Sequence, residues 1–581
     1  MADHVQRDPR PASVGESPSP DNGRQWLGRG RTFWLAVVAV YGLALLLPYL
    51  GAYPLISHEG HLAARTRELF ASGGGMIPHL NGQVDLQKPP LPFWAVGVAA
   101  AIGGGIGEWT ARLPQALSTI AAALLLVGWV GDWRSLRTGV LTGLIWLTSF
   151  VGIWYGRRAE PDMLLTFLTL LAFWAYWRAR SAGRFKATLG FCVLVGAALG
   201  ATVLIKGHHA VQFALATALV LAVADGRARR PALLAGLGLA VLVAAAVALP
   251  WFLYALHLYG QRAWTVWMHH SAGRLTDAIG SPTAWWFYLA TYPALTLPWI
   301  YAVGMGIYQS FRRKLLSGPM HALLLSWSLG GLVLLTLSAS RYVHYALPIA
   351  PPLFIYGGIG LDWLLFAVPR RLGRLGWATL GLHLALAPAG LAAGIWGAWQ
   401  FPDVGGVLLG VSIPAAAAVA GAFLAYGLGR RGLALAVFFL AYLGGAVALA
   451  GGVQAPLTRR EDTLHLAARY IARNVPDHQA AAMFCKWDPV AVFYAERRLA
   501  MLDSNSELRR WRRAHPGGVL LIKKEASLGY YDRALSVGPW ETIEFLHRRL
   551  YLPRTAYGLL RVPAEPATAP AKTRASDGPA E

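Results

Sequence analysis

The stretch that decides the fold is TFWLAVVAVYGLALLLPYLGAYPLISHEGHLAARTRELF, residues 32–70. Its first half is almost entirely apolar and long enough to cross a bilayer, which takes about 20 such residues. Its second half holds two histidines, two glutamates and two arginines. An apolar span followed at once by many ionisable side chains predicts a membrane protein whose functional groups gather at one face of the bilayer.

The composition of the whole chain extends this pattern. Of its 581 residues, 55% are hydrophobic and 14% are charged, whereas soluble domains carry roughly 25% charged residues. The net charge of +23 comes from arginine clusters between apolar blocks, which indicates membrane topology and argues against a nucleic-acid-binding protein. With only two cysteines, the chain has neither a disulfide framework nor a thiolate metal site.

The basic clusters also predict the topology, because lysine and arginine are enriched in cytoplasmic loops. All of the basic clusters can lie in the cytoplasm if the short Gly/Ala-rich block 91–107 lies at the membrane interface and does not cross the bilayer. We then expect thirteen spans in a transmembrane domain 32–452, with the N-terminus inside, the C-terminus outside and a long external loop at 52–111. Disordered tails are expected at 1–31 and 564–581.

The composition changes after residue 452, where the chain resembles ordinary soluble protein. TLHLAARYIARNV has helical periodicity, while AAAMFCKW, RRLAML and GGVLLIKK have the character of short strands. The sequence therefore predicts a small α/β domain at 453–563, outside the membrane.

The external loops hold most of the ionisable residues that topology does not explain. Ammonium and guanidinium groups bind phosphate, and a carboxylate can deprotonate an acceptor hydroxyl or amine. A lipid phosphate would be presented at this depth. Arg67 and Glu68 are expected to form only a solvated helix face. The remaining candidates on these loops are His58, Glu59, Lys88, Asp162, Lys206, Arg274 and Arg341.

The run HEGHLAARTRELFASGGGMIPHLNGQVDLQKPPLPFW, residues 58–94, resembles the first periplasmic loop of GT-C glycosyltransferases. The resemblance is to the lipid A aminoarabinose transferase branch, which is related to protein O-mannosyltransferases. Further matches follow in order: ARLPQAL (111–117), AEPDMLLTF (159–167), GATVLIKG (200–207), HHSAGR (269–274), LPW (297–299) and SRYVHYALPIAPPL (340–353).

The resemblance implies an α-helical polytopic GT-C fold with about thirteen spans and a periplasmic α/β domain. It implies an enzyme of the bacterial inner membrane that moves a sugar from an undecaprenyl-phosphate donor to a lipid, glycan or protein acceptor. No cofactor is then required, and a divalent metal is left open. The matching positions are Lys88, Lys206, Arg274 and, more loosely, Arg341 for the donor phosphate, Asp162 for an acidic residue, and His270 for a metal.

Two positions depart from the family pattern. The aspartate that serves as presumed base is His58 here, and the glutamate before Lys-Pro-Pro is Gln87, which removes a carboxylate metal ligand. Histidine can act as a general base, and Glu59 and Asp162 are the other candidates for that role. The substitution also fits an altered acceptor or a lost activity.

Two other classes of function therefore stay open. One is a non-catalytic relative that binds lipid phosphate, suggested by His58 and Gln87. The other is a transporter or flippase of a lipid-linked sugar. Transporters are built from internal repeats around a site near the midplane. This sequence has no convincing repeat, and its unexplained charges lie at one face, which favours the glycosyltransferase.

Overall fold

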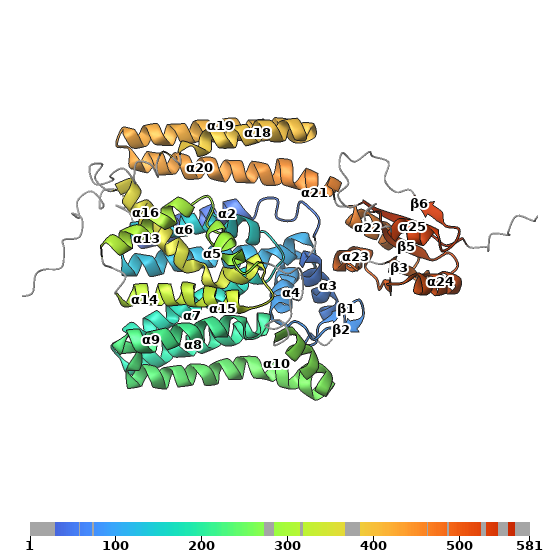
Figure 1. Cartoon of the computed structure of the whole chain (residues 1–581), viewed down its shortest axis with the longest axis horizontal. Coiled ribbons are helices and arrows are strands. Elements are labelled where there is room, and N and C mark those ends of the chain that lie inside the picture. Colours follow the sequence, from blue (N-terminus) through green and yellow to red (C-terminus); the bar gives the residue numbers. More distant parts are fainter. Residues whose placement is uncertain are drawn as a thin grey trace, which may run out of the picture.

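The computed structural model describes residues 30–56, 58–72, 75–271, 284–313, 318–366, 381, 384–461, 463–484, 487–524, 530–543 and 556–563. These residues form a stack of helices that run side by side, with a smaller unit of helices and strands at one end (Figure 1). The tails expected at 1–31 and 564–581 lie outside the described residues, except for Gly30 and Arg31.

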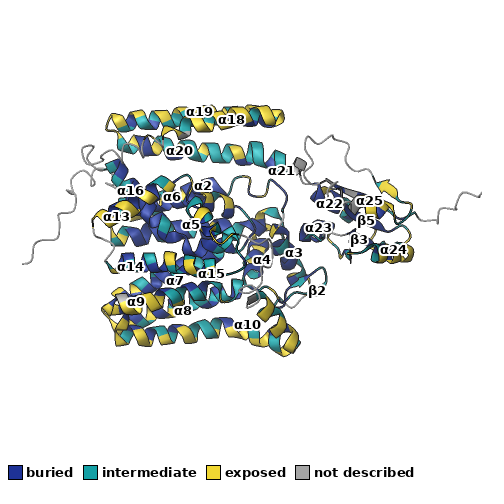
Figure 2. Cartoon of the chain, viewed as in Figure 1, coloured by how far each residue is buried: buried dark blue, intermediate teal, exposed yellow. Residues whose placement is uncertain are grey.

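The stack consists of apolar helices whose outward faces are also apolar. Leu219 and Leu242 are 72% and 68% exposed, and exposed residues cover much of the outermost helices (Figure 2). Such surfaces fit contact with lipid. The main helices are α2 (Arg31–Leu46), α5 (Glu108–Trp133), α6 (Leu136–Leu147), α7 (Asp162–Ser181), α8 (Phe185–Lys206), α9 (His209–Ala224), α10 (Pro231–Ser271), α12 (Phe287–Ala294), α13 (Ile300–Arg312), α14 (Pro319–Leu325), α15 (Gly331–Leu337), α16 (Pro351–Phe366), α18 (Leu386–Gln400), α19 (Pro402–Gly427) and α20 (Arg431–Leu449).

Six helices in the described part of the chain are long and apolar enough to cross a membrane. The number becomes seven if the bent pair Val343–Ile349 and Pro351–Phe366, which meet at 66°, counts as one span. Shorter apolar helices accompany them, so the chain is a multi-pass membrane protein. The expected thirteen spans stay a prediction.

Several expected spans are interrupted. The block 138–156 ends its α-helix at Leu147 and continues as the π-helical turn Val151–Tyr155, and the block 284–308 divides into α12 and α13. The two breaks meet, because the amide of Phe150 donates to the carbonyl of Leu297 (2.7 Å). Backbone groups released by one broken helix are thus satisfied by the other, as an apolar environment requires.

Close approach of helices depends on small residues. A Cβ on Gly306 of α13 would lie 1.8 Å from the carbonyl oxygen of Tyr356, and one on Gly360 of α16 would lie 1.9 Å from that of Ala302. The backbones of α13 and α16 therefore touch directly, which is the packing that small residues permit in membranes.

The first long loop folds into α3 (His58–Ala71), the short hairpin β1 (His79–Leu80) and β2 (Gln83–Val84), and α4 (Leu91–Gly103). Lys88 precedes Pro89 and Pro90, and the helix α4 begins directly after them. With 13 residues, α4 is too short to cross a bilayer, in keeping with the interfacial position expected for block 91–107.

The C-terminal unit is a mixed five-stranded sheet in the order β4-β3-β5-β7-β6. Strand β3 is parallel to β4 and β5, whereas β7 is antiparallel to β5 and β6. The three strands expected from the sequence are β3, β4 and β5. The elements are α22 (Leu464–Asn474), β3 (Ala481–Phe484), α23 (Pro489–Ala495), β4 (Ala500–Leu502), α24 (Asn505–Ala514), β5 (Val519–Lys524), α25 (Tyr530–Leu535), β6 (Glu541–Ile543) and β7 (Ala556–Arg561).

Side chains alternate across this sheet with a period of two. Met483 and Leu521 enter the core shared with α22, α23 and the first loop, while Ala482 and Leu520 enter a second core on the other face. The membrane helix that leads to this unit is longer than expected: α20 passes through a π-helical turn into α21 (Ala455–Glu461), so the helix ends about ten residues beyond the boundary at 452.

Candidate functional site

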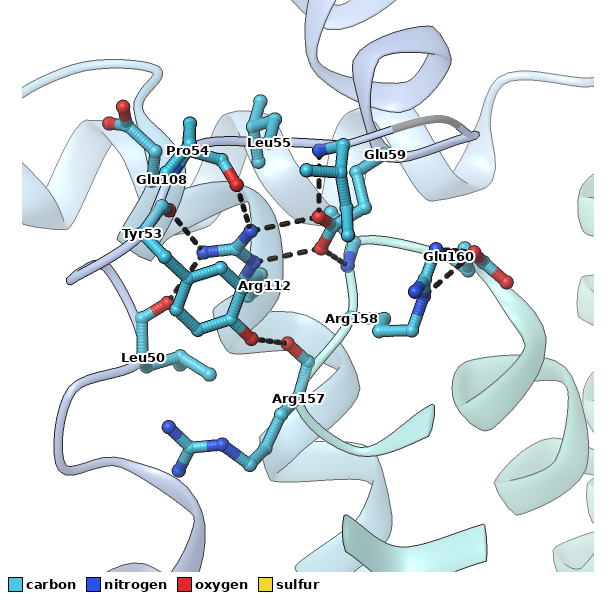
Figure 3. A network of polar contacts seen from close by, with 12 residues as sticks. Leu50, Tyr53, Pro54, Leu55, Glu59, Glu108, Arg112, Arg157, Arg158 and Glu160 are labelled. Carbon is cyan, nitrogen blue, oxygen red and sulfur yellow. Dashed lines mark hydrogen bonds and ion pairs between the residues drawn. The ribbon is translucent and has the colours of Figure 1, made fainter. Parts of the chain in front are cut away.

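Glu59, on the first turn of α3, is fully buried and held by Arg112 of α5 (Figure 3). The Nε and Nη2 atoms of Arg112 donate to its two carboxylate oxygens, each at 2.8 Å. The amides of Ile56 and Ala159 donate to the same oxygens at 3.1 and 2.8 Å. Burial opposes ionisation, but the charge and hydrogen bonds of Arg112 hold the pKa of Glu59 below its usual range.

Arg112 also fixes the start of the first loop. Its remaining N–H groups donate to three backbone carbonyls, all at 2.9 Å, and its guanidinium stacks on the ring of Tyr53 at 3.9 Å. The three carbonyls belong to Leu50, Tyr53 and Pro54. Because every oxygen of Glu59 is occupied, the geometry argues for an anchor that joins the loop to α5 and against a general base at Glu59.

A second arginine anchors the loop 157–161. Arg157 donates to the carbonyls of Leu46 and Pro48 at the end of α2, both at 2.8 Å. Arg158 forms an ion pair with Glu160 at 2.8 Å. Burial raises the pKa of Glu160, although Arg158 opposes the shift. These contacts hold in place the segment that precedes Asp162.

Asp162 begins α7 and Lys206 ends α8, so each charge lies at the helix terminus whose partial charge is opposite to its own. The carboxylate is 3% exposed, and Nζ of Lys206 is 2.5 Å from its Oδ1. The same ammonium group lies 5.4 Å from the ring centroid of Tyr345. Asp162 therefore fixes the position of Lys206.

Lys206 opens into a cleft that Lys88, Gln87 and His270 also line, together with His209 and Tyr345. We call this the lysine cleft. It brings together residues from the first loop, the end of α8 and the end of α10. Lys88 and Lys206, expected to bind the donor phosphate, and His270, expected to bind a metal, thus line the same cleft, and their roles stay predictions.

His58 is exposed at the start of α3, next to the buried Glu59. Its ring stacks on that of His61 with centroids 6.0 Å apart, and His61 lies 5.4 Å from Trp487 of the C-terminal unit. Burial, aided by the charge of Arg65, lowers the pKa of His61 to about 3, so this ring is neutral at physiological pH.

Two expected phosphate ligands are placed differently. Arg341 donates to the carbonyl of Thr336 at 3.0 Å. Its neighbours Ser338 and Tyr345 line the lysine cleft, so Arg341 lies beside that cleft. Arg274 lies outside the described residues.

Parts of this chain are similar to proteins of known name. A model of the family described as dolichyl-phosphate-mannose-protein mannosyltransferase matches residues 87–254. The undecaprenyl phosphate-alpha-4-amino-4-deoxy-L-arabinose arabinosyl transferase of Pectobacterium carotovorum is 28% identical over 366 residues, 62% of this chain and 65% of that protein. The transferase of the same name from Pseudomonas savastanoi pv. phaseolicola is 33% identical over 326 residues, 55% of this chain and 59% of that protein.

The fold is shared over a longer stretch. The crystal structure of ArnT from Cupriavidus metallidurans bound to undecaprenyl phosphate matches with a TM-score of 0.72 and 20% identity, covering 93% of this chain and 98% of that one. The chain has the GT-C fold. The resemblance predicted from the sequence is confirmed, although the sequence matches span less than two thirds of the length of these relatives.

Two residues of α3 have contacts that the sequence did not indicate. Arg67 and Glu68, expected on a solvated face, turn toward other parts of the protein. The carboxylate of Glu68 accepts hydrogen bonds from the backbone amides of Asn81 and Gly82, both at 2.7 Å. Arg67 donates to the carbonyl of Phe493 and stacks over its ring at 4.0 Å. The expectation of a solvated face is therefore wrong.

Other residues near Lys206 could have been found from the sequence. His344 and Tyr345 lie in the matching run 340–353, and His209 follows the matching Lys206-Gly207. Their position in or beside a matched motif could have marked them as candidates. Arg112 was part of the matched ARLPQAL, but its partner Glu59 lies 53 residues away, and spacing in sequence does not reveal such a pair.

Proposed function

We propose that this protein is an integral membrane glycosyltransferase that moves a sugar from an undecaprenyl-phosphate donor to a lipid, glycan or protein acceptor outside the bacterial inner membrane. The observation that carries the proposal is the lysine cleft, where Lys88 and Lys206 converge and Asp162 fixes one of them. ArnT of the same fold binds undecaprenyl phosphate, and the relatives matched in sequence are arabinosyl transferases by name.

The charges of the cleft suit a phosphate leaving group. In the reaction, an acceptor oxygen or nitrogen forms a bond to the anomeric carbon while the bond from that carbon to the phosphate oxygen breaks. The ammonium groups of Lys88 and Lys206 stabilise the charge that develops on undecaprenyl phosphate. Asp162 keeps Lys206 aimed at the phosphate and is itself neutralised by that pairing.

The acceptor proton must pass to a base. Glu59 is occupied by Arg112 and Asp162 by Lys206. His58 is exposed at the start of α3. We therefore propose that His58 is the base that takes the proton of the acceptor. This agrees with its place at the position of the family's presumed base.

No step of the proposed reaction passes through a metal. Within the described ranges, no group of three or more His, Cys, Asp or Glu side chains could hold a metal ion. His270 shares its cleft with Gln87, a neutral amide, and with two ammonium groups that would repel a cation. This donor set does not fit the divalent metal left open at His270.

The finer topology belongs to the proposal as well. We infer thirteen spans, a cytoplasmic N-terminus and a periplasmic α/β unit. Direct contacts between α3 and the α/β unit support placing both on one face, among them the stacking of Arg67 on Phe493. The basic clusters between apolar blocks support placing the opposite face in the cytoplasm.

The test is turnover by the purified, full-length protein with a radiolabelled undecaprenyl-phosphate sugar and envelope extract, read by mass spectrometry of the products. We expect transfer by the wild type, and a fall of about 100-fold or more in D162N and K88Q, because each disturbs phosphate stabilisation. D532N and K186Q, which alter exposed residues elsewhere, are the matched controls and retain activity.

Other outcomes would support the alternative functions. Binding of undecaprenyl phosphate without any product would indicate a non-catalytic relative. Movement of the lipid-linked sugar across proteoliposomes without a covalent product would indicate a flippase. Full transfer by both D162N and K88Q, with the variants monodisperse, contradicts the proposed site.

A further inference from the structure

A cleft between the ends of α5 and α7 and the start of α8 shares no residue with the lysine cleft. We call it the arginine cleft. Its volume is about 600 Å³, within the roughly 300–1,000 Å³ that is usual for small-molecule sites. The side chains used below are Trp129, Asp132, Trp177, Arg178, Arg184 and Phe191.

The arginine cleft lies at the far end of the helices that carry the candidate site. Asp162 begins α7 beside Lys206, and Arg178 lies in the last turn of the same helix, about 24 Å away at roughly 1.5 Å per residue. Helix α5 begins at Glu108, which binds Tyr494 of the α/β unit, and lines the cleft only with its last turns. The hydrocarbon core of a bilayer is roughly 30 Å thick. The arginine cleft therefore lies at the membrane interface opposite the α/β unit.

The rim of this cleft, formed by Asp132, Arg178 and Arg184, is positively charged. Arg184 is exposed, and its side chain has no hydrogen bond or ion pair with any residue that the structure describes. Arg178 stacks over the ring of Phe191 at 5.5 Å and is 3.4 Å from Asp132. Asp132, the only acid among the described residues that line the cleft, is paired more closely with Arg31, at 2.5 Å. The rim therefore keeps a net positive charge.

The start of α8 adds backbone donors to the rim. The first amides of a helix have no partner within the helix. Arg184 is the N-cap of α8 and provides no side-chain cap, and the first turn contains no acid. The positive end of the helix dipole thus adds to the charge of the two arginines. Guanidinium groups and helix N-termini both bind phosphate well.

The inner wall of the cleft is aromatic and lies deeper in the membrane. It consists of Trp129, Trp177 and Phe191. Trp129 lies one turn before the end of α5, and Phe191 lies about 9 Å into α8. The buried indole N–H of Trp129 has no acceptor within the described part of the chain, so this wall retains an unused donor. Polarity thus falls from the helix ends toward the membrane interior, as it does along a phospholipid.

We propose that the arginine cleft binds an anionic phospholipid, with its phosphate between Arg178 and Arg184 and its apolar part against the aromatic wall. Arginines at helix ends commonly set topology, but these two also line a cleft. A soluble phosphate would use the rim and leave the aromatic wall without a partner. Basic pockets between membrane helices at the cytoplasmic side bind anionic lipids in this way.

This inference goes beyond the proposed sugar transfer and does not depend on it. Only the leaflet, which is the cytoplasmic one, rests on the proposed topology. A ligand that binds the folded protein alone also raises its stability. We therefore expect an anionic lipid to stabilise the ends of α5, α7 and α8 against unfolding.

The test measures lipid binding to the delipidated, full-length protein by native mass spectrometry. The probes are phosphatidylglycerol, zwitterionic phosphatidylethanolamine, soluble glycerol 3-phosphate and undecaprenyl phosphate. We expect phosphatidylglycerol to bind about tenfold more tightly than phosphatidylethanolamine and to raise the unfolding temperature. R184Q should weaken phosphatidylglycerol about fivefold, the effect of one arginine at a membrane surface, and R178Q/R184Q should weaken it more than tenfold.

Two further variants are controls. R230Q changes an exposed arginine of the basic cluster between α9 and α10, outside the arginine cleft, and should bind phosphatidylglycerol as the wild type does. K88Q alters the lysine cleft and should also keep this binding, whereas R178Q/R184Q should still bind undecaprenyl phosphate.

Each remaining outcome contradicts the inference or separates it from the proposed function. Equal affinity of R184Q and the wild type for phosphatidylglycerol overturns the site, and R184Q can be relied on to fold because the Arg184 side chain has no partner among the described residues. Binding of glycerol 3-phosphate as tight as that of phosphatidylglycerol indicates a soluble ligand and contradicts the lipid. An equal loss in R230Q indicates general surface charge and contradicts the cleft. The expected lipid affinities without sugar transfer by the wild type support the site and overturn the proposed function alone.

Discussion

At the scale of single residues, the site separates buried charges that hold the protein together from charges that face a cleft. Glu59 and Arg112 are buried and bind each other and nearby backbone groups, whereas Lys88 and Lys206 line the lysine cleft. Sequence motifs mark both kinds alike, because both are ionisable residues beside apolar segments. Only burial and partners distinguish them.

The variant E59Q tests the anchoring role. It leaves Arg112 buried beside a neutral amide, and breaking a buried ion pair by removing one partner costs about 3–5 kcal/mol. We expect a clear fall in the thermal unfolding temperature in detergent, measured by intrinsic fluorescence. A variant that keeps wild-type stability but loses all transfer would instead make Glu59 a catalytic base.

The partly buried His61 predicts a dependence of stability on pH. The pKa of His61 is lowered from its ordinary value of 6.5 to about 3. The folded state therefore binds fewer protons than the unfolded state between these values, and stability that is full above pH 6.5 is lost as the pH falls toward 3. H61Q should show a shallower fall across this window in denaturation followed by fluorescence. An identical slope in both proteins would contradict the prediction.

At the scale of elements, a helix kink and two helix ends position the residues of the candidate site. The kink at Gly260 directs the end of α10 over the first loop, and the termini of α7 and α8 bring Asp162 to Lys206. The sequence predicts much of this frame. Periodicity and strand composition correctly located α22 and strands β3, β4 and β5, because these depend on local patterns.

Other features could not be predicted, since they depend on distant partners. Strand β7 completes the sheet by pairing with β5, and no pattern in GLLR alone indicates that partner. Blocks 138–156 and 284–308 each have enough apolar residues for one span. Each helix is broken, however, and the amide of Phe150 in one block donates a hydrogen bond to the carbonyl of Leu297 in the other. Arg67 and Glu68 have helical surface spacing, and only tertiary contact reveals their binding to Phe493 and the hairpin.

The kink in α10 is open to test. G260A places a side chain in a left-handed conformation, a strain of about 1–3 kcal/mol, so we expect the end of α10 to reorient and transfer to fall. G238A, in the regular part of the same helix with no atom near the added Cβ, keeps activity. Unfolding temperature and turnover measured together check the prediction, and equal behaviour of the two variants would exclude a role for the kink.

At the scale of the whole molecule, the membrane stack and the α/β unit are joined through the first loop. Tyr494 accepts from the amide of Leu55 at 2.7 Å and donates to Glu108 at 3.0 Å, and Asn81 pairs with both backbone groups of Leu499. The α/β unit thus shares its core with the loop that carries His58 and Lys88. Its position is coupled to the site.

Removing one of these contacts should loosen the joint without unfolding either part. N81A deprives the amide and carbonyl of Leu499 of their partner, a loss of about 1–3 kcal/mol. We expect faster hydrogen exchange in β4 and the hairpin, measured by mass spectrometry, with exchange in α13 and α16 unchanged. Uniform exchange rates across wild type and variant would show that the joint does not depend on Asn81.

The helix that links the two parts has a geometric consequence. The continuous apolar segment Arg431–Thr458 has 28 residues, which at about 1.5 Å per residue gives a rod of about 42 Å. The hydrocarbon core of a bilayer is roughly 30 Å thick. A helix of this length extends beyond the hydrocarbon core, so its end sets how far from the lipid the α/β unit that follows it begins.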